Sequence, residues 1–271
     1  MPIYTDHTCE GVTYGWHNTT ILESITTHRG TYVEMIQRPK WGIACYMDNA
    51  IQSCEIDEAL YHESLVHPVM SSSTCPKRVM IIGGGEGATA REVLKYPTVE
   101  CVDMYEWDKD VVQLFRSKYP QWAKGAWDDP RLHLYHDDIF KTIEEYPVDQ
   151  YDVVIIDLFD PSADTYDSWK HLIQHVTKWV RPGGSIVMYS GIRDRISSEQ
   201  PYDVLAGIVM SMSNGNIFYK NHITPYHVFI PSFSGESTFL LLSSDTDFKM
   251  DHTIGSHVTD LVWKSYQTFN W

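Results

Sequence analysis

The sequence predicts an α/β protein in which a doubly wound, Rossmann-like sheet follows a small N-terminal antiparallel β domain. After Lys77, apolar runs alternate with helical stretches, as in a parallel sheet that is covered on both faces. A glycine-rich turn, GGGEG, joins the first apolar run to a helical stretch. Before Gln52, short runs rich in Thr, Tyr, Ile and Val are broken by glycine and proline, which is typical of antiparallel strands.

The individual elements follow from these patterns in chain order. We expect residues 1–54 to form the β domain and residues 55–271 the Rossmann-like domain. The segment EIDEALYHESLVH between them predicts a joining helix, with Asp57 placed to cap its start and Pro68 to end it. The expected strands of the second domain are RVMII, VECVDMYE, RLHLYH, YDVVIIDLFD and RPGGSIVMYSG, followed by YHVFIPSF and STFLLLSS as an antiparallel edge.

Composition narrows the possible functions. The chain has 271 residues, with 36 Asp and Glu against 21 Lys and Arg, and a formal charge of -15. This charge repels nucleic acid and anionic lipid surfaces and attracts small cations. The five cysteines are odd in number and lack CxxC spacing, so neither a disulfide framework nor a zinc knuckle is indicated. No basic, apolar leader and no run of about 20 apolar residues is present, so we expect a cytoplasmic protein.

The glycine-rich turn predicts a nucleotide-binding site. Gly83 and Gly85 lie between a strand and a helix, where a ligand can approach backbone amides at the start of the helix. The same segment also satisfies the dinucleotide fingerprint G-x-G-x-x-A through Gly83, Gly85 and Ala88. The glycine spacing alone therefore leaves a nicotinamide enzyme open.

Acidic residues follow successive predicted strands at the edge where open α/β sheets bind ligands. A carboxylate after the second strand, Glu106, can accept hydrogen bonds from a ribose diol, and Asp138 can accept one from an adenine amino group. Any one of these acids could instead be a solvated loop residue or a helix cap. Their accumulation disfavours a pyrophosphate ligand and favours cationic ligands, such as a sulfonium donor and an amine acceptor. The acids concerned are Glu86, Glu106, Asp138, Asp157 and Asp160.

An amine nucleophile needs a base, because its pKa near about 10 keeps it protonated at neutral pH. Asp157, in the segment DLFDP, is our candidate. Tyr61 and His62 lie on the predicted joining helix, where packing between the two domains would explain them equally. His171 and His175 are four residues apart on a predicted helix, but no third ligand is evident nearby, so we expect no metal there.

The motifs together resemble those of the spermidine synthases, and especially the thermospermine synthase branch, whose first turn also carries Glu. The resemblance runs from Met47 to Met188, with a weaker similarity in HVFIPSF. It implies an adenosylmethionine methyltransferase-type α/β domain behind the N-terminal β domain. The segments that carry it are MDNAIQSCEIDEALYHESLVHP, IIGGGEGATAREVL, YEWDKDVV, DDPRLHLYHDD, YDVVIIDLFDP and RPGGSIV.

The resemblance implies aminopropyl transfer from decarboxylated S-adenosylmethionine to an amine such as putrescine or spermidine, without a metal or another cofactor, in a homodimer or homotetramer. Asp157 would be the base that frees the attacking amine. The substrate-binding residues would be Gln52, Tyr61, His62, Glu86 and Asp160, with Tyr61 and His62 bordering the crevice; the nucleoside-binding residues would be Gly83, Gly85, Glu106 and Asp138.

Several positions depart from the family pattern. Gly30 and Thr31 replace a Tyr-Gln pair whose Gln contacts the nucleoside, and the usual Gly- and Pro-rich gate is rewritten as PSADTYDSW. Most of the departures surround the expected acceptor pocket, so an unusual amine is plausible. Besides the nicotinamide enzyme, two alternatives stay open at this point. The enzyme could use intact S-adenosylmethionine, although Glu86 would repel the carboxylate of that donor, or the scaffold could bind ligands without catalysis.

Overall fold

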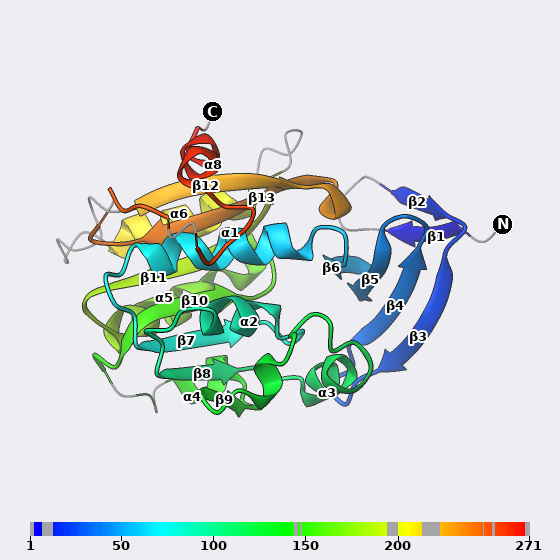
Figure 1. The fold of residues 1–271 in the computed structure, drawn as a ribbon, viewed down its shortest axis with the longest axis horizontal. Coiled ribbons are helices and arrows are strands. Elements are labelled where there is room, and N and C mark those ends of the chain that lie inside the picture. Colours follow the sequence, from blue (N-terminus) through cyan, green and yellow to red (C-terminus); the bar gives the residue numbers. More distant parts are fainter. Residues whose placement is uncertain are drawn as a thin grey trace.

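The computed structural model describes residues 3–6, 13–143, 146, 148–193, 200–212, 223–245, 247–250 and 253–268. Small N-terminal sheets lie at one end of the molecule, and a large sheet covered by helices forms the rest (Figure 1). Across these described ranges, none of the helices is both long enough and apolar enough to span a bilayer.

The N-terminal part is antiparallel throughout. A two-stranded sheet precedes a four-stranded sheet whose strands are paired in chain order. The last hairpin turns through Asp48 and Asn49, which both have positive φ, a conformation that Asn and Asp tolerate and that two-residue hairpins require. The strands are β1 (Ile3–Asp6), β2 (Tyr14–His17), β3 (Thr20–Thr26), β4 (Tyr32–Arg38), β5 (Gly42–Met47) and β6 (Ala50–Cys54).

The joining helix, α1 (Glu58–Ser71), continues past the proline that we expected to end it. Pro68 has no N–H to offer the carbonyl of Ser64 one turn earlier, a loss that normally breaks a helix. Here the hydroxyl of Tyr226 donates a hydrogen bond of 2.9 Å to that carbonyl. The predicted end at His67 was therefore wrong, because a strand distant in sequence satisfies the orphaned acceptor.

The large sheet has seven strands in the order β12-β13-β11-β10-β7-β8-β9. The five strands from β11 to β9 in this order are parallel, and β13 runs antiparallel to both of its neighbours. The predicted doubly wound sheet is confirmed, with β12 at its antiparallel edge and β9 at the other edge. The strands are β7 (Arg78–Gly83), β8 (Cys101–Tyr105), β9 (Leu132–Tyr135), β10 (Tyr151–Asp157), β11 (Val180–Arg193), β12 (Ile223–Ile230) and β13 (Gly235–Leu242).

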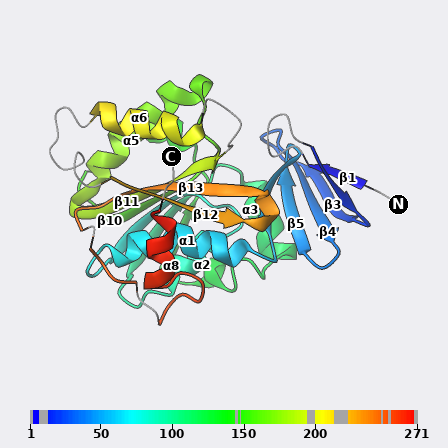
Figure 2. The ribbon, with the colours of Figure 1, turned by 90° about the horizontal axis from the view of Figure 1, so that it is seen from above.

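Helices cover both faces of this sheet, and the side chains of its strands alternate between two cores. In β10, Val153 and Ile155 pack with one set of helices, whereas Val154 and Ile156 pack with the other. α5 and α6 lie opposite α1 and α8 across the sheet (Figure 2). The first set is α1, α2 (Ala88–Leu94) and α8 (Asp260–Tyr266); the second is α4 (Ile139–Thr142), α5 (Tyr166–Trp179) and α6 (Pro201–Met212).

A third core fixes the N-terminal sheet to the large domain through α3 (Lys109–Lys118). Val33 and Met35 on β4 share this core with Leu114 and Phe115 of α3. The short helical turns η1 (Ala126–Asp128), η3 (Ala163–Thr165) and η4 (Pro231–Phe233) complete the described elements. The packing holds the β5–β6 hairpin above the carboxyl ends of the central strands, and so positions one wall of the candidate site.

Candidate active site

A cavity of about 750 Å³ opens at the carboxyl ends of β7, β8 and β10. This is the topological switch point of the sheet, because β8 lies on one side of β7 and β10 lies on the other. The cavity is lined by nearly all of the site residues that the sequence predicted: Gln52, Tyr61, Gly83, Gly85, Glu86, Glu106, Asp138, Asp157 and Asp160. His62 is the exception, because it lies behind Glu86 rather than on the cavity wall.

The glycine turn needs its glycines because other groups approach closely. Gly83 has a φ of +89°, and a Cβ there would collide with the backbone oxygen of Asp157. A Cβ on Gly85 would lie 3.1 Å from Oε2 of Glu106. Glycine at these two positions therefore lets the ends of three strands, β7, β8 and β10, come together around one space.

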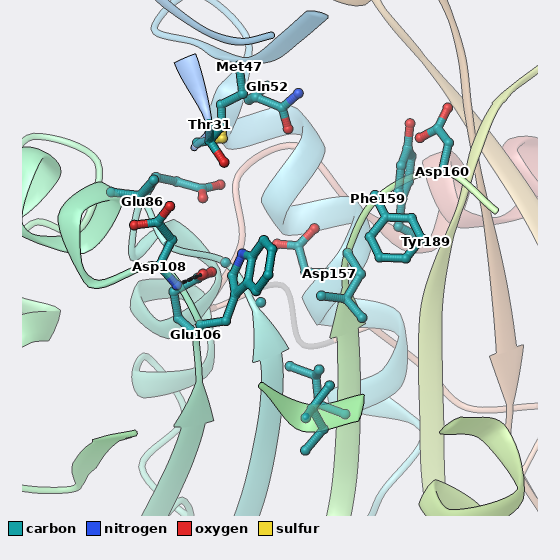
Figure 3. Close-up of a pocket in the computed structure, with 18 of the residues that line it drawn as sticks. Thr31, Met47, Gln52, Glu86, Glu106, Asp108, Asp157, Phe159, Asp160 and Tyr189 are labelled. Carbon is teal, nitrogen blue, oxygen red and sulfur yellow. Dashed lines mark hydrogen bonds between the residues drawn. The ribbon is translucent and has the colours of Figure 1, made fainter. Parts of the chain in front are cut away.

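Asp157, the last residue of β10, lies near the middle of the cavity residues drawn in Figure 3. The Tyr61 hydroxyl donates to its Oδ1 at 2.8 Å, and the Thr89 hydroxyl donates to its Oδ2 at 2.7 Å. Burial raises the pKa of Asp157, and the negative charge of Glu86 raises it further. A carboxylate with a raised pKa and fixed oxygens is suited to accept a proton.

A row of buried charges runs from the cavity wall into the protein. Nε2 of His62 lies 2.7 Å from Oε1 of Glu86, and its Nδ1 lies 3.2 Å from Oε2 of Glu58. Two nitrogens of Arg91 in turn donate to the two oxygens of Glu58, at 3.0 and 2.8 Å. Negative and positive groups alternate along this row, so each buried charge has an opposite neighbour.

The two carboxylates keep His62 charged. Burial of the ring opposes its protonation, but hydrogen bonds to Glu58 and Glu86 outweigh burial and raise the pKa of His62 to about 10. Burial works against ionisation of Glu58 as well, yet His62 and Arg91 together lower its pKa to about 2. At neutral pH, His62 is therefore an imidazolium that donates from both ring nitrogens and holds Glu86 in one orientation.

Glu106 follows β8 and is almost fully buried, with 8% of its surface exposed. Its Oε1 accepts a hydrogen bond of 2.9 Å from the backbone N–H of Asp108. Burial raises the pKa of Glu106 to about 7, although the Asp108 hydrogen bond opposes this shift. The carboxylate therefore changes its protonation state near neutral pH.

Asp138 lines the cavity and also caps a helix. Its Oδ1 accepts from the backbone N–H of Phe140 at 3.2 Å, and its Oδ2 lies 2.9 Å from Nζ of Lys141. Asp138 thus has a structural role as the N-cap of α4 that does not depend on any ligand. Both of its oxygens therefore already have partners within α4.

The far side of the cavity from Glu106 combines an acid with aromatic rings. Asp160, Phe159 and Tyr189 lie on the other side of Asp157 from Glu106 and Asp108, and Gln52 lies beside Met47 on the N-terminal sheet (Figure 3). Burial raises the pKa of Asp160, and a hydrogen bond from Tyr189 partly offsets that shift. This half can bind a cationic chain through an acid and ring faces.

Sequence reasoning missed several residues of the site. Thr89 lies on α2 behind the glycine turn and contacts Asp157, and Arg91 follows it on the same helix. Glu58 lies one helical turn before His62, so the spacing of four residues was a usable signal. The contacts of Thr89 and Arg91 join segments far apart in the chain, and no spacing could reveal them. Thr31, where the sequence departs from the family pattern, does line the cavity.

The histidine pair on α5 forms a local contact. Nδ1 of His175 lies 2.9 Å from the backbone oxygen of His171, and the ring centroids are 4.5 Å apart. This arrangement occupies one ring nitrogen of His175 with the backbone of its own helix.

Comparison with known proteins extends these observations. Residues 58–252 match the family model of the spermine/spermidine synthase domain. A polyamine aminopropyltransferase of Pyrobaculum calidifontis is 37% identical over 236 residues, which cover 83% of this chain and 78% of that protein. Polyamine aminopropyltransferase 2 of Pseudomonas aeruginosa is 40% identical over 206 residues, covering 74% of this chain and 56% of that protein.

Solved structures agree with this assignment at the level of the fold. A spermidine synthase crystallised with the transition-state analogue AdoDATO superposes with a TM-score of 0.85 at 23% identity, over 99% of this chain and 92% of that chain. Spermidine synthase from Thermotoga maritima gives a TM-score of 0.82 at 22% identity, over 98% and 91% of the two chains. From the family match and the relatives together, the chain belongs to the spermine/spermidine synthase family of polyamine aminopropyltransferases.

Proposed function

We propose that this protein transfers the aminopropyl group of decarboxylated S-adenosylmethionine to a di- or polyamine, putrescine or spermidine, and releases methylthioadenosine. The observation that carries the proposal is the position of Asp157. It lies between a half of the cavity with Glu106 and Glu86 and a half with Asp160 and aromatic rings (Figure 3). A base between two acidic half-sites suits a reaction in which both donor and acceptor are cations.

The donor would occupy the half next to the glycine turn. Glu106 would accept hydrogen bonds from the ribose hydroxyls, and Asp138 would accept one from the adenine amino group. Gly83 and Gly85 leave space for the nucleoside beside the backbone. Glu86, oriented by the imidazolium of His62, would bind the ammonium end of the aminopropyl chain. His62 would thus act on the substrate through Glu86.

The acceptor would occupy the other half. Asp160 would bind a distal ammonium group, and Gln52 would hold the amine from the N-terminal sheet. Tyr61 makes an edge-on contact with Tyr189 and a tilted contact with Phe233, with ring centroids 5.7 and 5.6 Å away. These rings would form the apolar wall along which the methylene chain lies. The residues of this half depart from the family pattern, so they do not define the length of the acceptor.

The reaction would be a single displacement. Asp157 removes a proton from the attacking ammonium group, and the freed nitrogen lone pair forms a bond to the carbon next to sulfur. The carbon–sulfur bond breaks, and its electron pair neutralises the sulfonium, so methylthioadenosine leaves. The proton stays on Asp157 until it passes to solvent. Alignment of the two substrates and placement of the carboxylates would provide most of the rate enhancement.

Mass spectrometry of reaction mixtures tests this proposal directly. The purified protein is mixed with decarboxylated or intact S-adenosylmethionine and a panel of amines. We expect methylthioadenosine and an aminopropylated amine with the decarboxylated donor alone, and the product identifies the acceptor. Reaction with intact donor alone would replace the proposal with other sulfonium chemistry. Failure of both donors would make the protein a non-catalytic member of the family.

We also propose, from the family resemblance, that the enzyme works in the cytoplasm as a homodimer or homotetramer. Light scattering during size-exclusion chromatography measures the mass of the particle against the 31.3 kDa of one chain. A monomer at micromolar concentration would contradict the assembly that we propose.

A further inference from the structure

Three side chains with metal-ligating atoms meet at the end of the sheet opposite the cavity. Cys101 begins β8, and Asp103 follows two residues later on the same face of the strand. His133 on β9 is the register partner of Asp103. The cavity begins near the other end of β8, at Tyr105 and Glu106. At about 3.3 Å per residue, Cys101 lies roughly 16 Å and Asp103 roughly 10 Å from Glu106 along the strand. None of the three residues lines the cavity, so the cluster is distinct from the proposed active site.

The spacing of the three ligand atoms matches one face of a tetrahedral zinc site. Sγ of Cys101 lies 3.6 Å from Nδ1 of His133 and 3.6 Å from Oδ1 of Asp103. Nδ1 of His133 lies 3.1 Å from the same Asp103 oxygen. Zinc bonds of about 2.3 Å to sulfur and about 2.0–2.1 Å to nitrogen and oxygen, at tetrahedral angles, place such atoms roughly 3.3–3.6 Å apart. A small movement would therefore bring all three atoms onto one ion.

The surroundings of Asp103 resemble the outer shell of a metal ligand. Its second oxygen, Oδ2, accepts from Nη2 of Arg78 at 3.2 Å and from the Tyr151 hydroxyl at 3.0 Å. These bonds hold the carboxylate and leave Oδ1 facing Cys101 and His133, as outer-shell partners do for ligating carboxylates. The Asp103 side chain is 7% exposed and that of His133 is 50% exposed, so water can reach the fourth position of the ion.

We propose that Cys101, Asp103 and His133 bind one Zn²⁺ ion, with water as the fourth ligand. A thiolate, an imidazole and a carboxylate form a donor set that suits zinc and not magnesium or calcium, which prefer oxygen ligands throughout. On binding, the Cys101 thiol releases its proton to solvent as the sulfur–zinc bond forms, and no group is oxidised or reduced. The ion would tie the edge strand β9 to β8.

Cobalt titration of the full chain tests this site. The protein is treated with a chelator, reduced, and titrated with Co²⁺, whose bond to a thiolate gives a charge-transfer band in the near ultraviolet. We expect one equivalent to produce the band and Zn²⁺ to displace the cobalt. Cys101→Ser should abolish the band, and His133→Asn should weaken Zn²⁺ binding at least tenfold. The matched control is Cys75→Ser, because Cys75 is an exposed free cysteine and should leave the band unchanged.

A second readout links the ion to the strands. Zn²⁺ should raise the melting temperature of the wild-type protein and of Cys75→Ser, and should not raise that of Cys101→Ser. Aminopropyl transfer should be the same in Cys101→Ser and in wild type, which separates failure of this site from failure of the proposed function. The proposal is wrong if no equivalent of Co²⁺ binds through a thiolate, or if the band persists in Cys101→Ser. Either result would leave the three side chains as a hydrogen-bonded cluster.

Discussion

The carboxylate of Asp157 shows how single contacts prepare a residue for proton transfer. Two hydroxyls, from Tyr61 and Thr89, each donate to one of its oxygens, so the carboxylate cannot rotate. Burial and the charge of Glu86 raise its pKa, which makes it a stronger base than a solvated aspartate. Position and basicity therefore arise from the same surroundings.

Removing this base should slow turnover strongly and spare donor binding. In Asp157→Asn, an amide cannot accept the proton, and we expect kcat to fall about 10²- to 10⁴-fold. Calorimetry should find the affinity for the donor within about threefold of wild type, since the donor is held by other residues. The matched control is Asp203→Asn, which changes an exposed acid on α6 and should retain full activity. A wild-type rate in Asp157→Asn would remove this residue from the mechanism.

Glu106 should make donor binding depend on pH. Its pKa of about 7 means that the carboxylate is ionised above neutrality and protonated below it. Only the ionised form accepts hydrogen bonds from both ribose hydroxyls, so the dissociation constant of the donor should rise about tenfold for each pH unit below about 7. Calorimetry across this range measures the slope.

Glu106→Gln should bind the donor more weakly at neutral pH and lose the slope, because an amide does not titrate. Glu100→Gln, at an exposed glutamate beyond the other end of β8, should keep both the affinity and the slope of wild type. An unchanged affinity in Glu106→Gln would show that the ribose lies elsewhere.

At the scale of elements, helix α1 places two polar side chains, Glu58 and His62, on one face. Glu58 and His62 are one turn apart, so both lie on the face that meets α2 and the glycine turn. Arg91 on α2 keeps Glu58 ionised, and Glu58 and Glu86 together keep His62 charged. The packing of two helices thereby fixes the direction of a carboxylate on the cavity wall.

The stability of this arrangement should depend on pH through His62. Its pKa is raised to about 10 in the folded protein from about 6.5 in the unfolded chain. Its contribution to stability is therefore fully present below about 6.5 and is lost as the pH rises through about 10. In urea unfolding, the difference in unfolding free energy between wild type and His62→Gln should shrink as the pH rises across this interval.

The same variant should weaken donor binding, because Glu86 loses the charge-assisted hydrogen bond that holds it in one orientation. His175→Gln, on the partly exposed α5 pair, is the matched control for both measurements. A constant stability difference across the pH range would contradict the assignment of His62 as an imidazolium.

At the scale of the whole molecule, the acidic balance should assist capture of a cationic acceptor. The formal charge of -15 and the acids around the cavity attract polyamines before they bind. Raising the ionic strength from about 0.01 M to about 1 M shortens the Debye length from about 30 Å to about 3 Å. We expect kcat/KM for the amine to fall about tenfold or more over this range.

The control for this effect is the inhibition constant of methylthioadenosine, which is uncharged and should respond little to salt. Equal salt dependence for the amine and for methylthioadenosine would show that ionic strength acts on the protein itself. The comparison therefore separates attraction of the substrate from an effect on folding.

The sequence by itself determined the fold class and most of the cavity wall. Apolar runs separated by helical patterns indicate a parallel sheet, and such sheets bring the carboxyl ends of their strands to one edge. For this reason Glu86, Glu106, Asp157 and Asp160 could be assigned to one crevice from their positions after strands. These inferences depend on local periodicity, which the chain encodes directly.

Only the tertiary structure decided the contacts between distant segments. Tyr226 lets α1 continue past Pro68, Thr89 contacts Asp157, and Arg91 pairs with Glu58 behind His62. The proposed zinc ligands likewise come together only because β8 and β9 pair, so the spacing of cysteines along the sequence could not predict the site. Hydrogen bonds and charge interactions depend on distances of a few ångströms in space. The number of residues between two positions in the sequence does not predict that distance.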